Sequence, residues 1–186
     1  MNLIMLLLGI TNKGVYMKKK LKLLVLTGLL AVGTTASAYI EVGVAKQEYA
    51  STSITGFNVG LGSDTYWDSG FYSGFDFDVN FGELYSEQVL GLGMDINLGW
   101  SFFDSLALYG LIGYNSQSIY NTSRSEFNTY LGLGYGAGVN YKITDNFAVD
   151  LKYKKATLEY FDTTEFKFSG SDFDYTSLGI NLKISF

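Results

Sequence analysis

The sequence predicts an all-β protein, an eight-stranded antiparallel up-and-down β-barrel that crosses a membrane. Segments in which apolar and polar residues alternate recur along the chain, and a period of two residues is that of a β-strand. The last segment, 178–186, alternates without a break and ends on an aromatic residue. This combination suggests a barrel whose apolar face meets lipid. The apolar residues of that segment are Leu178, Ile180, Leu182, Ile184 and Phe186.

Residues 17–38 are predicted to be a secretory signal peptide. A basic segment follows Met17, a short apolar run comes next, and the small residues at 36–38 form a cleavage site of A-x-A type. The apolar run is too short for a typical membrane-spanning helix, although an N-terminal anchor helix is the alternative. We expect residues 1–16 to be an extension of the gene model, which leaves 39–186 as the barrel domain.

The mature chain is expected to be strongly acidic. After residue 38 the sequence contains eight basic and eighteen acidic residues, a net charge of −10 against −5 for the whole chain. This balance argues against nucleic acid as a partner. The chain has no cysteine and therefore no disulfide, and it has no proline to interrupt the hydrogen-bonded ladders of a sheet.

The first four predicted strands carry aliphatic or aromatic residues at alternate positions, with mostly small or polar residues between them. The segments and their leading apolar residues are 39–49 (Ile40, Val42, Val44), 53–62 (Phe57, Val59, Leu61), 70–81 (Phe75, Phe77, Val79) and 88–100 (Leu90, Leu92, Met94).

The second half of the chain continues the pattern with one irregular strand. In 105–115 the residues Tyr109 and Leu111 fall on the face opposite Leu106 and Leu108. The other three segments are 129–143 (Leu131, Leu133, Tyr135), 147–158 (Val149, Leu151, Tyr153) and 178–186.

The polar faces of these strands favour a narrow membrane barrel over a soluble one. They are rich in Gly, Ala and Asn, and the interior of an eight-stranded barrel has room for little more than such side chains. The opposite face is broadly apolar, so in water it would cause aggregation. A soluble lipocalin-like barrel is the alternative, but it would line its cavity with the apolar face.

The lengths of the connections predict the orientation of the barrel. The segments 101–105 and 144–146 are short, as periplasmic turns are, whereas 82–87, 116–128 and 159–174 are longer, as outer loops are. The connection 63–69 is long for an inner turn. We expect any host or phage ligand to contact 116–128 and 159–174.

Aromatic residues near the strand ends suggest two girdles at the membrane interfaces. The alternative is that Tyr and Phe are simply common in strands. The expected periplasmic girdle contains Trp100, Phe102, Phe103, Tyr141, Phe147 and Phe186, and the expected outer girdle contains Tyr49, Phe81, Tyr85, Phe127, Tyr130 and Tyr160.

The chain resembles the small eight-stranded outer-membrane barrels of Gram-negative bacteria, the OmpA-like, OmpX-like and opacity-protein group. The resemblance rests on the alternating architecture, on the segment 108–114 and on the terminal Phe186. It implies an outer-membrane location in contact with lipid and lipopolysaccharide. Some OmpA-like proteins carry a periplasmic peptidoglycan-binding domain, which we do not expect here because the sequence stops at the eighth segment. The resemblance also implies that the barrel assembly machinery reads the C-terminal strand. The residues that match this assembly signal are Ile180, Leu182, Ile184 and Phe186.

Charged residues on the polar faces predict a network inside the barrel, because buried charges are expected to be paired. The predicted network contains Glu41, Asp76, Asp78, Asp95, Asp150, Lys152, Lys154 and Lys183. The last strand must pair with the first, so Glu41 and Lys183 are expected partners. The alternative is that Asp76, Asp78 and Asp95 hold a cation.

The sequence predicts no catalysis and no cofactor. It contains neither His nor Cys, so a serine activated by histidine and metal sites of the Cys/His type cannot be built. We expect a non-enzymatic protein with a structural and surface-interaction role: envelope integrity, adhesion or ligand contact through its outer loops. The alternative is a narrow porin-like channel for small solutes or ions, although eight strands normally leave a filled interior.

Overall fold

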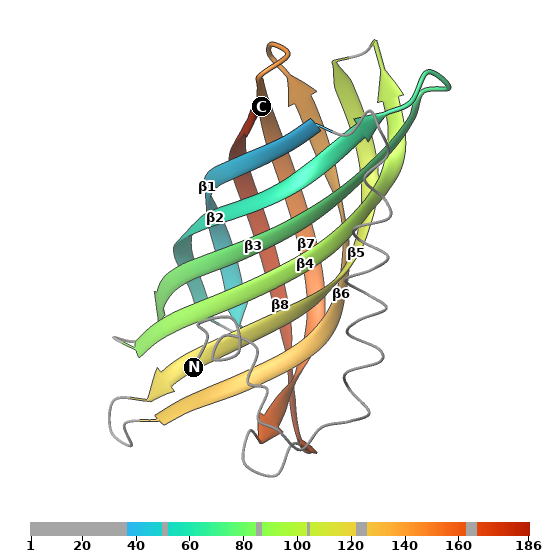
Figure 1. The fold of residues 1–186 in the computed structure, drawn as a ribbon. Coiled ribbons are helices and arrows are strands. Elements are labelled where there is room, and N and C mark those ends of the chain that lie inside the picture. Colours follow the sequence, from blue (N-terminus) through green and yellow to red (C-terminus); the bar gives the residue numbers. More distant parts are fainter. Residues whose placement is uncertain (1–36, 50–51, 85–86, 104, 122–125, 163–166) are drawn as a thin grey trace, which may run out of the picture.

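The computed structural model describes residues 37–49, 52–84, 87–103, 105–121, 126–162 and 167–186. They form one closed antiparallel barrel in which each strand pairs with its neighbours in the sequence and β8 pairs with β1 (Figure 1). The predicted fold class is confirmed. The strands are β1 (Ser37–Tyr49), β2 (Thr52–Tyr66), β3 (Phe71–Leu84), β4 (Glu87–Phe102), β5 (Leu106–Asn121), β6 (Glu126–Lys142), β7 (Phe147–Asp162) and β8 (Lys167–Ser185).

The two ends of the barrel differ, and we name them by what lies there. Tyr39 pairs with Ser185 at the end where β1 begins and β8 finishes, which we call the termini end. We call the opposite end the hairpin end, because the β5–β6 and β7–β8 hairpins reach it. The described residues contain no helix that is both long and apolar enough to cross a membrane.

The strands are longer than the sequence predicted, and the difference is largest at the hairpin end. The segments 116–128 and 159–174, predicted as long loops, are mostly paired strand: β5 and β6 remain in register to Asn121 opposite Glu126, and β7 and β8 to Asp162 opposite Lys167. The prediction was wrong because alternation is imposed only where one face meets lipid. Beyond that depth the hydrogen-bonded ladder continues without it.

The predicted signal peptide and the first sixteen residues stay predictions. Residues 1–36 lie outside the described residues, and Ser37 and Ala38 are the first two residues of β1. Cleavage after Ala38 would therefore remove only the start of that strand.

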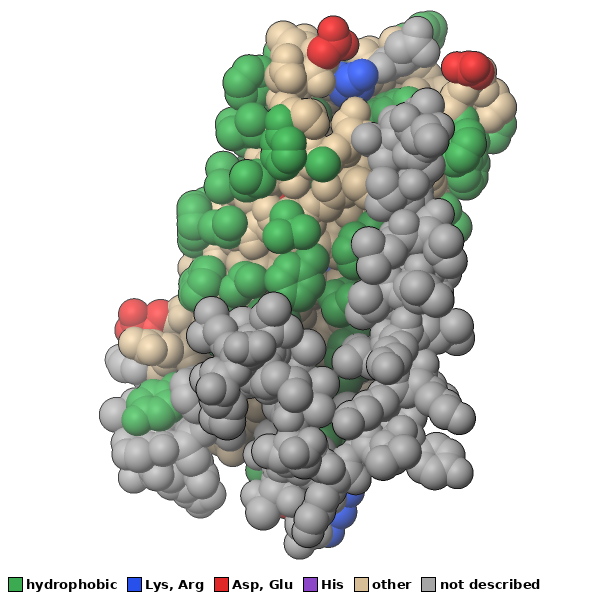
Figure 2. Space-filling model, viewed as in Figure 1, with side chains coloured by type: hydrophobic (Ala, Val, Ile, Leu, Met, Phe, Trp, Pro, Cys, Tyr) green, Lys and Arg blue, Asp and Glu red, His purple; other side chains and the backbone are tan. Residues whose placement is uncertain are grey.

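The outer face of the barrel is an apolar belt. The alternate residues that the sequence placed on the lipid face point outward, among them Ile112 and Leu133, with 58% and 69% of their surface exposed. On the part of the wall that Figure 2 does not draw in grey, hydrophobic side chains predominate, and the described charged side chains lie towards the ends of the barrel. This facing is the one a barrel in lipid requires.

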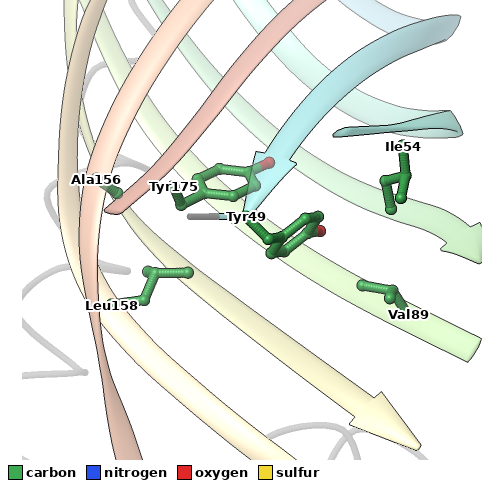
Figure 3. Close-up of a cluster of buried hydrophobic side chains, with 6 residues drawn as sticks. All are labelled: Tyr49, Ile54, Val89, Ala156, Leu158 and Tyr175. Carbon is green, nitrogen blue, oxygen red and sulfur yellow. The ribbon is translucent and has the colours of Figure 1, made fainter. Parts of the chain in front are cut away.

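The inner face carries two apolar layers, one towards each end. The hairpin-end cluster (Figure 3) includes Tyr49 and Tyr175, whose ring centroids are 5.3 Å apart. Its buried members are Tyr49, Ile54, Val89, Ala156, Leu158 and Tyr175. The termini-end cluster consists of Tyr72, Ala107, Tyr109 and Leu111. Together the two clusters fill the lumen above and below its middle.

Three members of the expected outer girdle face the lumen instead. Tyr49 is buried, and Tyr130 packs its ring against Phe173 at 4.9 Å, beside the hairpin-end cluster. Tyr160 is opposite Tyr130 in the β6–β7 register, and their ring centroids are 5.6 Å apart. Parity explains the error, because each of these tyrosines shares its face with the inward residues of its strand. Tyr85 and the side chain of Phe127 lie outside the described part of the chain.

Candidate functional site

The middle of the lumen contains the charged residues that the sequence singled out. Strict alternation along the five strands that carry these residues directs their side chains inward. Each of the side chains is buried. They come from β1 (Glu41), β3 (Asp76, Asp78), β4 (Asp95), β7 (Asp150, Lys152, Lys154) and β8 (Lys183).

Two lysines of β7 reach across the lumen to β3 and β4. The Lys152 ammonium lies 2.6 Å from Oδ2 of Asp76 and 4.0 Å from Oδ2 of Asp95. The Lys154 ammonium lies 2.5 Å from Oδ2 of Asp95 and 4.0 Å from Oδ2 of Asp78. These ion pairs connect strands on opposite walls and therefore cross the space that a channel would need.

Lys183 pairs with a different set of carboxylates from the one expected. Its ammonium lies 3.2 Å from Asp64 and 3.9 Å from both Asp76 and Asp150. Glu41 is opposite Lys183 in the β1–β8 register, as predicted, but the two do not form the expected ion pair. The long lysine side chain reaches past its register neighbour, so register alone does not decide its partner.

Asp64 was missed because the sequence placed it in the 63–69 connection. In the structure β2 continues to Tyr66, and Asp64 is buried on the inner face of this strand. It accepts a hydrogen bond from the hydroxyl of Tyr72 at 2.6 Å. Asp64 shares its parity with the inward glycines at 60 and 62, and this was the signal that could have identified it.

Tyrosine hydroxyls also donate hydrogen bonds to the buried carboxylates, a role that was not predicted from the sequence. Tyr109 donates to both oxygens of Asp150 at 2.8 Å, and Tyr39 donates to Asp76. Tyr109 had looked like an irregularity of its strand because it sits on the polar face. Its hydroxyl explains the position, since a buried tyrosine normally finds a hydrogen-bond partner.

Glycines provide the space for these large inward side chains. A Cβ on Gly138 would overlap the ring of Tyr109. A Cβ on Gly60 would lie 2.8 Å from Cγ of Glu41 and 2.8 Å from the carbonyl oxygen of Phe77. The glycine-rich inner face is therefore what lets charged and aromatic side chains share a narrow lumen.

The sequence left open that Asp76, Asp78 and Asp95 hold a cation, and the arrangement of the lysines does not favour this alternative. Lysine ammonium groups lie within ion-pair distance of Asp76 and Asp95. Within the described ranges, no group of three or more acidic side chains is arranged to hold a metal ion. What the site does chemically is neutralise buried charge and obstruct the lumen.

The four residues of the predicted assembly signal lie away from this site, on the lipid face of β8 and just after it. Ile180, Leu182, Ile184 and Phe186 are all exposed. They form an apolar row that runs to the C-terminus at the termini end.

A family model described as the outer membrane protein beta-barrel domain matches residues 23–186. The chain belongs to this family. The protein is thus an outer-membrane β-barrel, and the resemblance drawn from the sequence and the expected location in the outer membrane are confirmed.

Solved structures share the fold of this outer-membrane barrel. Neisserial surface protein A has a TM-score of 0.55 at 17% identity, with 82% of this chain and 98% of that chain covered. Ail, the attachment invasion locus protein of Yersinia pestis, has a TM-score of 0.54 at 17% identity, with 81% and 97% covered. At these identities the likeness concerns the fold alone. A comparison with curated proteins finds no match.

We expect the outer-membrane barrel to be heat-modifiable on SDS gels and to migrate faster before boiling than after it. The reason is that β8 pairs with β1, so the sheet has no free edge at which unfolding can begin. Fractionation of cells followed by gels with and without boiling is the measurement. Recovery of the protein in the soluble periplasmic fraction would contradict the expectation.

Proposed function

We propose that this barrel is a non-enzymatic outer-membrane protein that contributes to envelope structure and makes contacts at the cell surface through its hairpin end. The observation that carries the proposal is the filled lumen. Two apolar clusters and a layer of ion pairs between them occupy the inside of the barrel. A barrel filled in this way offers its outer surface, and not a pore, for function.

The absence of catalysis is part of the proposal and follows from the side chains available. The sequence contains no His and no Cys, so a serine hydroxyl has no imidazole to activate it. Except for Glu41, the buried carboxylates of the described lumen are engaged by lysine and tyrosine side chains, as Asp76 is by Lys152 and Asp150 is by Tyr109.

The β7–β8 hairpin supports a surface role. β7 and β8 contain 16 and 19 residues, whereas a tilted strand needs about 9–11 residues to cross a bilayer. Because both chain termini of such barrels are periplasmic, we place the hairpin end outside the cell. The strands then extend beyond the lipid, and the ring pair Phe161–Phe168, 5.3 Å apart, lies near the tip.

The charge of this hairpin indicates the kind of partner. Residues 159–174 contain five acidic residues and a single lysine, Lys167. A neutral or basic surface therefore suits it better than a polyanion, because like charges repel. In this it would differ from Ail, which has been crystallised with the heparin analogue sucrose octasulfate. The names of Ail and Neisserial surface protein A are consistent with a surface role for the fold.

Two further partners belong to this proposal. The apolar belt would contact lipid and, in the outer leaflet, lipopolysaccharide. The exposed row Ile180, Leu182, Ile184 and Phe186 is accessible to the assembly machinery that the sequence resemblance implies.

The test is to shorten the hairpin without disturbing the barrel. The β7–β8 register is irregular between Glu159 and Phe161, and Glu159 pairs with Asp172 below that point. Replacing residues 160–171 by an Asn-Gly turn therefore preserves the register below. Cells that express this variant should bind basic matrix proteins or host-cell monolayers several-fold less than cells with the unmodified protein. A matched control shortens the β5–β6 hairpin at the pair Ile119 and Asn128. If both variants fold and bind as well as the unmodified protein, the surface role is rejected and only the structural role remains.

A further inference from the structure

Among the described residues, Glu41 and Asp95 are the acidic side chains of the predicted network with no hydrogen-bond partner for either carboxylate oxygen. Asp95 has the Lys154 ammonium at 2.5 Å, whereas no ion pair between described residues includes Glu41. Only 1% of the residue's surface is exposed. Leaving a carboxylate buried without a partner costs several kcal/mol, so natural proteins satisfy such groups or neutralise them. The groups around Glu41 therefore indicate what kind of ligand would satisfy its carboxylate.

Asp78 lies two strands away in the same row of the sheet. Glu41 is opposite Gly60 in the β1–β2 register, and Gly60 is opposite Asp78 in the β2–β3 register. Because the residue between them has no side chain, nothing on β2 separates the two carboxylates. The Lys154 ammonium reaches Asp78 only at 4.0 Å, while it contacts Asp95 at 2.5 Å.

Both carboxylates line a cavity of about 30 Å³ in the lumen. Asn58 lines it as well, and its Oδ1 is also buried without a hydrogen-bond partner in the described part of the chain, while its Nδ2 donates to Asn181 at 2.8 Å. Three buried acceptor oxygens without a hydrogen-bond partner, both of Glu41 and Oδ1 of Asn58, thus belong to residues that line one small space. Oδ1 of Asp78, by contrast, accepts a hydrogen bond from Nδ2 of Asn80. The cavity is large enough for a single ion or one to two waters.

The number of buried charges in the lumen also favours an additional cation. The buried charged side chains of the described lumen are three lysines, Lys152, Lys154 and Lys183, and six carboxylates, Glu41, Asp64, Asp76, Asp78, Asp95 and Asp150. The closest ion pairs of the lysines are to Asp76, Asp95 and Asp64, at 2.6, 2.5 and 3.2 Å. Lys152 and Lys154 also line the cavity, but the closest partner of each is another carboxylate, so neither Glu41 nor Asp78 has a lysine in close contact.

We propose that Glu41, Asp78 and Asn58 bind a small monovalent cation of the size of Na⁺ inside the lumen. Carboxylate and amide oxygens are the ligands that hard cations prefer. A monovalent ion suits the site better than Ca²⁺ or Mg²⁺, because Ca²⁺ takes about six to eight oxygen ligands and Mg²⁺ requires a near-ideal octahedron, and three side chains around so small a cavity supply fewer. The ion adds a counter-charge in direct contact with Glu41, on which Lys152 and Lys183 act only from a distance.

The test compares the full barrel refolded into detergent micelles in sodium chloride with the same barrel refolded in N-methylglucamine chloride at equal concentration. The organic cation is too large for the cavity, while general salt screening is the same. We expect the urea midpoint of unfolding to be higher in sodium and to rise with the logarithm of its concentration, because an ion that binds only the folded state stabilises it by mass action. Equal midpoints in the two salts would overturn the proposal.

Two variants locate the effect. Glu41→Gln preserves the shape of the side chain and should abolish the difference between the two salts. Glu48→Gln, on the same strand but exposed, should retain it. Retention of the full sodium effect in Glu41→Gln would also overturn the proposal. If that variant does not fold, crystals of the unmodified protein grown with thallium(I) decide the matter: an anomalous peak beside Glu41 and Asp78 supports the site, and the absence of a peak rejects it.

Discussion

Replacing Ile112 by arginine is expected to destabilise the barrel by about 2–4 kcal/mol, because it places a charge on the lipid face near the middle of the bilayer. Ile112 lies six residues into β5 from the termini end and is 58% exposed. With a rise of roughly 3.3 Å per residue and a tilt of about 40°, this position is about 15 Å above that end of the strand. The free energy of unfolding in urea, measured in lipid vesicles, is the readout.

The matched control is Thr157→Arg. Thr157 is exposed on β7, two residues beyond Lys155, whose side chain is a native charge on the same outward face. There the belt gives way to polar side chains, so arginine should cost at most about 1 kcal/mol. Equal losses of unfolding free energy at the two positions would mean that the outer face is not in contact with lipid at the height of Ile112.

Removing both lysines that cross the lumen is expected to have the largest effect of any change at the charged site. In Lys152→Ala with Lys154→Ala, Asp76 and Asp95 lose their closest ammonium partners, at 2.6 and 2.5 Å. Breaking a buried pair from one side costs about 3–5 kcal/mol, because the remaining charge stays buried. The two losses should not add fully, since both lysines lie within 4.0 Å of Asp95. Equilibrium unfolding of the single and double variants measures the cost and the coupling.

Lys155→Ala is the control for that experiment. Lys155 follows Lys154 in the sequence, but it points outward and pairs with Asp174 at 3.7 Å with both side chains well exposed. Such surface pairs contribute little, so this change should cost at most about 0.5 kcal/mol. A loss as large as that of Lys154→Ala would show that the charge network of the lumen is not what stabilises the barrel.

The same variants test whether the lumen is closed. Planar-bilayer recording should detect no stable conductance from the unmodified protein, because ion pairs and two apolar clusters obstruct the lumen. The double lysine variant loses the side chains that bridge the walls but retains both apolar clusters, so any increase in its current measures how much of the obstruction the ion pairs supply. Large and stable currents from the unmodified protein would contradict the closed lumen and favour the narrow channel.

Most of the fold could be predicted from the sequence, because alternation is a local property with a period of two. Lipid on one face and a narrow lumen on the other impose this alternation on every strand. The face to which the side chain of Ile112 or of Lys152 points therefore follows from its odd or even position in the strand alone. The same parity would have placed Tyr49 and Asp64 inside the barrel, had it been applied to the ends of their strands.

The choice of partners inside the lumen was decided only by the tertiary structure. Glu41 and Lys183 are neighbours in the register, as the sequence predicted, yet the ammonium of Lys183 pairs with Asp64 of β2. A lysine side chain is long enough to choose among several carboxylates, and which one it reaches depends on the tilt and stagger of the closed sheet. The ends of the strands could not be predicted from the sequence for a related reason. Beyond the lipid, main-chain hydrogen bonds extend the ladder without requiring any side-chain pattern.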